Sequence, residues 1–180
     1  IMNKKEFIIK VEQLREKHKI LAIASTIDIE IVGIPFITAA EILSGAGVER
    51  IKYILETENN YQKIAKSLNT HIKLDSEGLV EDLREVLTAM EQGLDLLIRE
   101  EVKIGILLHM CFLIDKLKDN GKETFFEGLQ YFVAQYKREL AIIRGCLTSL
   151  EDQYEISIGV HEEAFICRML LFNADIIQEN

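Results

Sequence analysis

The sequence predicts a mainly α-helical protein, in which a helical bundle is preceded by a small α/β segment. First, its 180 residues include one proline, no tryptophan and only 7% aromatic residues, a composition that favours helices in a globular chain. Second, apolar residues recur at helical spacing through most of the second half. Third, a single convincing buried strand lies in the first half. We place the boundary near Asp75, so that residues 1–74 form an α/β connecting segment and residues 75–180 form the bundle.

The chain begins with a short amphipathic helix. Phe7, Val11 and Leu14 are spaced to lie on one face, with charged residues between them, so we expect a helix that ends at about His18. The run KILAIASTIDI follows (19–29) and combines β-branched and aliphatic residues over a strand's length. It is the predicted buried strand, and it needs neighbours because one strand cannot form a sheet domain.

Two further helices are expected before the boundary. Thr38 and Glu41 have the spacing of a capping box, which satisfies backbone N–H groups at a helix start. The short helix that they begin should end at Gly45 to Gly47, because glycine terminates helices well. A second helix should run from Val48 to about Leu55. The polar stretches that follow are where a domain boundary is most easily accommodated.

The second half contains four expected helices with short connections, which is the pattern of an all-α bundle. Their predicted bounds are Leu79 to Arg99, Val102 to Lys118, Thr124 to Leu150, and His161 to Ala174. The second is apolar on all sides and should therefore lie in the middle of the bundle. Asn120 and Gly121 should end it, and Thr124 with Glu127 should form another capping box at the start of the third.

Charge and hydropathy narrow the possible partners and location. The net charge of −9 provides no basic face, so we expect no direct contact between this fragment and nucleic acid. No apolar run approaches the roughly 20 residues that span a bilayer, and the start lacks a signal-peptide pattern, so we expect a cytoplasmic protein that does not bind membranes. The Ile before Met2 fits either a piece of a longer protein or a residue left by cloning.

Catalytic and metal-binding motifs are not evident in the sequence. It contains no GxSxG, no glycine-rich phosphate loop and no HExxH, so we do not expect an enzyme. His109 and Cys111 are two residues apart and point about 200° away from each other on a helix. His161 and Cys167, six apart, also diverge. We therefore expect neither a metal site nor a cofactor, and we expect the cysteines to be free thiols.

His109 is a single histidine in the apolar run IGILLHMCFLIDKL (104–117). The usual role of such a residue is structural, with the ring hydrogen-bonded to a neighbour. Lys116 lies seven residues later, on the same face of the helix. A neutral imidazole near a cation can also accept a phosphoryl group, which would add roughly two negative charges where helices or subunits meet. Both interpretations remain open at this point.

From about Asp75 onward the chain resembles a PTS regulation domain (PRD), the helical module through which the bacterial sugar phosphotransferase system (PTS) controls transcription regulators. IGILLHMCFLIDKL is similar to the family's histidine helix, in which an arginine follows the histidine by seven residues. ISIGVHEEAFICRMLLFNA (156–174) is similar to its final helix. The resemblance implies that His109 is phosphorylated by the phosphocarrier protein HPr or an enzyme IIB, with Lys116 as the supporting cation, in a homodimer.

The stretch ILAIASTIDIEIVGIPFITAAEILSG (20–45) is similar to the segment before the C-terminal PRD copy in sigma-54-dependent regulators of the levanase-operon activator type. Lys116 replaces the family's arginine, which keeps the charge but loses bidentate geometry. The family's second histidine would fall on Met169 or Leu170. His161 is a weak second-site candidate, for which an N-cap or surface role is favoured. The alternative function is a helical dimerisation module with a structural, unmodified histidine.

Overall fold

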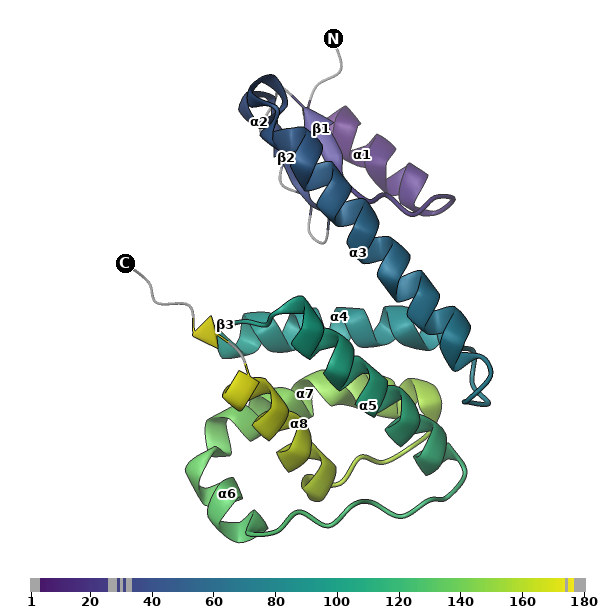
Figure 1. Ribbon diagram of the computed structural model, residues 1–180, viewed down its shortest axis with the longest axis vertical. Helices are drawn as coiled ribbons and strands as arrows, with labels where there is room; N and C mark the ends of the chain where they lie inside the picture. Colours follow the sequence, from purple (N-terminus) through teal and green to yellow (C-terminus); the bar gives the residue numbers. More distant parts are fainter. Residues whose placement is uncertain (1–3, 26–28, 30, 32–33, 174, 177–180) are drawn as a thin grey trace. The chain divides into compact units, whose positions relative to one another are not determined.

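The computed structural model describes residues 4–25, 29, 31, 34–173 and 175–176. These residues are mainly helical (Figure 1), which confirms the predicted fold class. The helices are α1 Lys4–Arg15, α2 Ala39–Ser44, α3 Ala46–Leu68, α4 Ser76–Leu94, α5 Glu100–Lys118, α6 Leu129–Gln135, α7 Lys137–Tyr154 and α8 Val160–Asn173. The strands are β1 Ile23–Ser25, β2 Phe36–Thr38, β3 Leu96–Leu97 and β4 Asp175–Ile176. The chain divides into two compact units, Ile1–Lys63 and Ile64–Asn180.

The first unit has a small sheet in which β1 and β2 run parallel, with Ile23 opposite Phe36. The predicted strand at 19–29 is thus present as β1, and part of the predicted run lies outside the described residues. Side chains from α1, β1 and the following segment form a buried cluster: Val11, Ile23, Ile29, Ile31 and Ile34. Such a cluster covers one side of a two-stranded sheet, which has too little surface to bury a core of its own.

The capping box predicted at the start of α2 is confirmed. The Thr38 hydroxyl accepts the Glu41 N–H at 3.2 Å, and the Glu41 carboxylate accepts the Thr38 N–H at 2.7 Å. Gly45 ends α2 in the left-handed conformation, with φ +81°. The next helix, α3, continues well past the predicted end at Leu55, because the polar run at 56–63 contains no proline or glycine to stop it.

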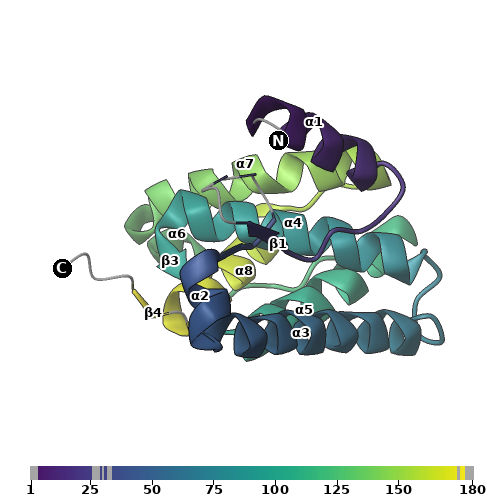
Figure 2. The same cartoon turned by 90° about the horizontal axis from the view of Figure 1, so that it is seen from above.

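In the second unit, α4, α5, α7 and α8 form a four-helix arrangement (Figures 1 and 2). Helix α4 packs on both α5 and α7, and α8 packs on the same two helices. Large side chains with at most 1% exposure fill the space between them: Leu79, Leu83, Leu87, Met90, Ile106, Leu107, Met110, Ile114, Ile143 and Leu147. Burial of side chains of this size typically stabilises a fold by about 1.5–3 kcal/mol each.

Helix α4 begins and ends earlier than predicted. The Asp75 carboxylate accepts the N–H groups of Glu77 and Gly78, both at 3.3 Å, and so caps the helix start. The helix ends at Asp95, which is in the left-handed conformation with φ +53°. Leu97, predicted to continue the apolar stripe, instead lies in β3, opposite β4, and is 59% exposed.

The predicted helix from Thr124 to Leu150 is wrong in its first part. Figure 1 shows residues 119–128, which we call the α5–α6 loop, as a long irregular connection. Gly128 has φ +74° and stands before α6, and the helical path is interrupted again at Tyr136 before α7. The second capping box does not form, because the Thr124 N–H donates to Glu162 in α8. Among the described residues, no helix has the length and apolar character needed to cross a membrane.

Candidate functional site

His109 lies on a partly exposed face of α5. Gly105, His109, Phe112 and Lys116 are spaced by four, three and four residues and form one stripe along the helix. The His109 side chain is 35% exposed and Phe112 is 48% exposed. The opposite face is buried in the core. The prediction that α5 is surrounded on all sides was therefore only partly right, since this stripe is partly exposed.

The ring of His109 faces a buried carboxylate on the first turn of α8. Nε2 lies 3.5 Å from Oε2 of Glu162, whose side chain is 1% exposed. Both atoms are buried, and neither has a hydrogen bond. The other carboxylate oxygen, Oε1, accepts the Thr124 N–H at 2.7 Å. Glu162 therefore lies between the candidate acceptor and the α5–α6 loop.

Sequence reasoning missed Glu162 as a site residue. Two adjacent glutamates at the start of α8 are the usual pattern of solvated side chains that interact with the positive end of a helix. Glu162 and Glu163 are instead 1% and 8% exposed. One sequence feature could have indicated their burial. The residues that follow them on α8 are mainly apolar, which implies that the whole first turn packs against neighbouring helices.

His161 holds the α5–α6 loop rather than capping α8 or standing free on the surface. It is the second residue of α8, and its Nδ1 accepts the Phe126 N–H at 3.1 Å. Its ring also contacts Phe125, with ring centroids 5.2 Å apart. The structure brings His161 into contact with this loop.

Lys116 is exposed near the end of α5 and does not touch His109. Seven residues at 1.5 Å each place the two positions about 10 Å apart along the helix. The Lys116 side chain forms no hydrogen bond or ion pair with any residue that the structure describes. Its charge is therefore available to a partner that approaches the stripe.

Comparison with known families matches residues 84–173 to the PRD domain. The matched region contains α5, α7, α8, His109 and Glu162. The chain belongs to the PRD family. PRD domains are typical of bacterial transcription regulators that are controlled by the PTS, with whose components they interact, and they are generally non-catalytic. Comparisons with curated proteins and with solved structures give no match.

A second cluster of charges in this PRD domain fixes the connection between α7 and α8. Arg144 contacts Glu151 at 3.0 Å and Glu163 at 2.8 Å, and it donates to the Ile158 carbonyl at 2.8 Å. Burial raises the pKa of Glu163, and the guanidinium opposes that shift. The Ile158 N–H donates to Glu151 at 2.6 Å. The three charged side chains of this cluster are therefore paired with one another.

Two of the three cysteines of the PRD domain, Cys111 and Cys167, are buried free thiols. Burial raises the pKa of Cys111 to about 12, and burial, with a smaller effect of Glu139, raises that of Cys167 to about 12. A thiol with such a pKa is a poor nucleophile and metal ligand at neutral pH. Within the described part of the chain, no three His, Cys, Asp or Glu side chains gather as a metal site would require.

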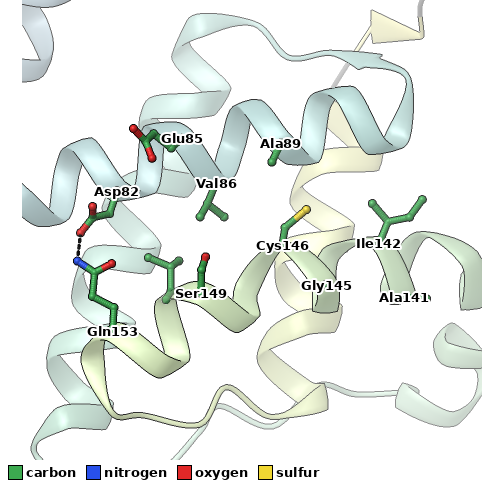
Figure 3. Close-up of a pocket in the computed structure, with 11 residues that line it drawn as sticks. Asp82, Glu85, Val86, Ala89, Ala141, Ile142, Gly145, Cys146, Ser149 and Gln153 are labelled. Atoms are coloured by element: carbon green, nitrogen blue, oxygen red, sulfur yellow. Dashed lines mark hydrogen bonds between the residues drawn. The ribbon is translucent and has the colours of Figure 1, made fainter. Parts of the chain in front are cut away.

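A groove of about 690 Å³ lies between α4 and α7 on the PRD domain (Figure 3). Asp82 closes one end by accepting a hydrogen bond from the Gln153 amide at 2.7 Å. Cys146 and Ser149 are among the few other polar side chains that line it. His109 does not line this groove. The groove therefore adds nothing to the chemistry proposed for His109.

Proposed function

We propose that His109 of this PRD domain accepts a phosphoryl group from a PTS protein, either HPr or an enzyme IIB, and that this modification regulates the transcription regulator to which the domain belongs. The observation that supports the proposal is that the ring is partly exposed while one edge is held against buried Glu162. A phosphoryl acceptor has to be both reachable and oriented. A histidine retained only for packing has no need of an exposed edge.

Gly105 contributes to the accessibility of the ring. A helical side chain leans over the turn that precedes it, which for His109 is the turn containing Gly105. A Cβ atom added at Gly105 would meet nothing within 4 Å, and the residue is exposed. The space beside the imidazole is therefore open to a donor protein. Phe112 and Lys116 extend the same stripe and provide apolar and positively charged contacts for such a protein.

The regulatory effect would follow from charge. A phosphoryl group adds roughly two negative charges, and on the partly exposed ring of His109 these would lie on the α5 stripe. The added charge would change the packing of α5 against α8, through the contact of the ring with Glu162, or the packing of a homodimer that uses the stripe. Lys116 would offset part of the charge at longer range. No cofactor is needed for the transfer.

The larger protein that we propose is a sigma-54-dependent regulator of the levanase-operon activator type, in which this chain provides the C-terminal PRD copy and the segment before it. The support is the similarity of residues 20–45 to that segment. Sequencing the gene upstream tests this assignment, since an ATPase module must be encoded there. A gene with a different upstream domain would exclude the assignment without affecting the role of His109.

Incubation with phosphoenolpyruvate, enzyme I and HPr, with and without enzymes IIA and IIB, tests the phosphorylation. We expect intact-mass analysis at alkaline pH to show one phosphoryl group on the wild-type chain, none on His109→Ala, and an unchanged label on His161→Ala. A wild-type chain that stays unmodified with every donor would favour the helical dimerisation module with a structural histidine. A label that persists in His109→Ala would place the acceptor elsewhere.

A further inference from the structure

We propose that Glu162 is a positioning residue that directs phosphoryl transfer to Nδ1 of His109 rather than to Nε2. This inference rests on the proposed phosphorylation of His109, and it specifies which atom reacts and which neighbouring side chain decides it. Nothing in the sequence pattern distinguishes the two ring nitrogens. The distinction comes from the contact between α5 and α8.

The two nitrogens of His109 have different surroundings. Nε2 is buried and lies 3.5 Å from Oε2 of Glu162. Nδ1 is not among the buried unsatisfied atoms of the described residues and has no hydrogen bond. A buried nitrogen without a hydrogen bond would be among those atoms, so Nδ1 keeps some contact with solvent. A donor protein that approaches the α5 stripe therefore reaches Nδ1 without moving α8.

Glu162 differs from its neighbour in having an oxygen without a partner. Buried polar atoms are nearly always hydrogen-bonded, so an exception needs an explanation. Glu163 is also buried and is paired with Arg144 at 2.8 Å. Glu162 uses Oε1 for the Thr124 N–H and leaves Oε2 facing the imidazole edge. At 3.5 Å this contact is longer than a normal hydrogen bond, and a small rotation of the ring would bring Nε2–H into range.

The carboxylate selects a tautomer. An oxygen acceptor opposite Nε2 favours the neutral imidazole with its proton on Nε2, which leaves the lone pair on Nδ1. During transfer, that lone pair forms the new N–P bond while the N–P bond of a phosphohistidine donor, whose ring is protonated on its other nitrogen, breaks. The donor imidazole keeps the electron pair of the broken bond and becomes neutral. The His109 ring becomes a phosphoimidazolium, whose Nε2–H donates to Glu162, so no proton has to move.

Glu162 would also stabilise the charge that develops on the ring. Hydrogen bonds to an ionised partner are roughly twice as strong as neutral ones. Replacement of the carboxylate by an amide of the same shape in Glu162→Gln removes that difference but leaves an oxygen that can accept from Thr124. We expect transfer to His109 to slow about tenfold in this variant. Glu163→Gln is the matched control, because Glu163 is a buried glutamate on the same helical turn that faces Arg144 instead.

The first measurement uses the unmodified full chain. Nitrogen-15 NMR at a pH where imidazole is neutral should show His109 as the Nε2–H tautomer in the wild type and in Glu163→Gln, and a shift toward a mixture in Glu162→Gln. A predominant Nδ1–H tautomer in the wild type would overturn the proposal. This result does not depend on phosphorylation, so it separates the inference from the proposed function.

The second measurement identifies the phosphohistidine isomer. The wild-type chain is phosphorylated in parallel with phosphoramidate and with the phosphoenolpyruvate relay, and phosphorus–nitrogen NMR then locates the phosphoryl group. We expect the Nδ1 isomer. The Nε2 isomer would overturn the role of Glu162 while leaving His109 as the acceptor. The Nδ1 isomer from phosphoramidate, with no transfer from the relay, would support the positioning role and contradict the proposed function. Neither wild-type experiment depends on a variant that folds.

Discussion

Replacing Arg144 by Met tests whether the charge cluster between α7 and α8 stabilises the bundle on which the candidate site depends. Methionine keeps most of the aliphatic stem but removes three contacts, to Glu151, Glu163 and the Ile158 carbonyl. The two glutamate side chains are each about 10% exposed. Loss of one partner of a buried ion pair typically costs 3–5 kcal/mol. Because Arg144 itself is 46% exposed, we expect the lower end of that range, about 3 kcal/mol at pH 7.5.

The loss of unfolding free energy in Arg144→Met should depend on pH, because Arg144 is paired with the titratable carboxylate of Glu163. Burial raises its folded-state pKa above the ordinary value of 4.5, so the folded protein binds this proton more tightly than the unfolded chain does. The stability due to that proton is present at low pH and is lost as the pH rises through the folded pKa. Arg144 limits this loss, so Arg144→Met should make it larger. At pH 4 we expect the variant to cost only about 1 kcal/mol.

Urea unfolding followed by circular dichroism at pH 4 and pH 7.5 measures both costs. Arg138→Met is a suitable control, because Arg138 lies on the same helix and contacts Asp95 only at 4.0 Å with both side chains mostly exposed. It should change the free energy of unfolding by less than about 0.5 kcal/mol at either pH. Equal costs for Arg144→Met at the two pH values would refute the argument that a desolvated Glu163 carboxylate is responsible.

Two further predictions concern buried groups of the same domain. Because burial raises the pKa of Cys111 and Cys167 to about 12, iodoacetamide at pH 8 should alkylate the partly exposed Cys146 first, and mass mapping should show the other two labelled only on unfolding. Ser76→Ala removes a buried hydroxyl that donates to the Ala65 carbonyl at 2.7 Å, so urea unfolding should show a loss of about 1–3 kcal/mol. Rapid labelling of all three cysteines would contradict the first expectation. An unchanged free energy of unfolding in Ser76→Ala would contradict the second.

The two predicted capping boxes show what can and cannot be read from a local pattern. Thr38 with Glu41 forms the predicted reciprocal hydrogen bonds. Thr124 with Glu127 has the same spacing, yet the Thr124 N–H is taken by Glu162, which is 38 residues later in the chain. A local motif therefore held where no distant acceptor competed for the backbone group. It failed where tertiary packing supplied a buried carboxylate.

The residues of the candidate site also differ in whether a local sequence pattern could predict them. His109 could be chosen from the sequence because an imidazole interrupts an otherwise apolar helix, and helical spacing placed Lys116 on the same face. Glu162 could not, since its burial depends on how α8 crosses α5, which no pattern within either helix specifies. The end of α3 was missed for a different reason: its polar residues were interpreted as a connection, although none of them breaks a helix.

Through Glu162, the proposed modification of His109 on α5 would also affect the α5–α6 loop. The first turn of α8 and the residue before it hold the α5–α6 loop at three points: Gly159 donates to Glu123, Glu162 accepts from Thr124, and His161 accepts from Phe126. Only Glu162 also faces the ring of His109. A phosphoimidazolium that draws the carboxylate toward Nε2 would therefore weaken one of three attachments, whereas the other two would keep the loop in place. The response of the loop should be a partial loosening rather than a complete release, which would give the domain two closely related packing states for a partner protein to distinguish.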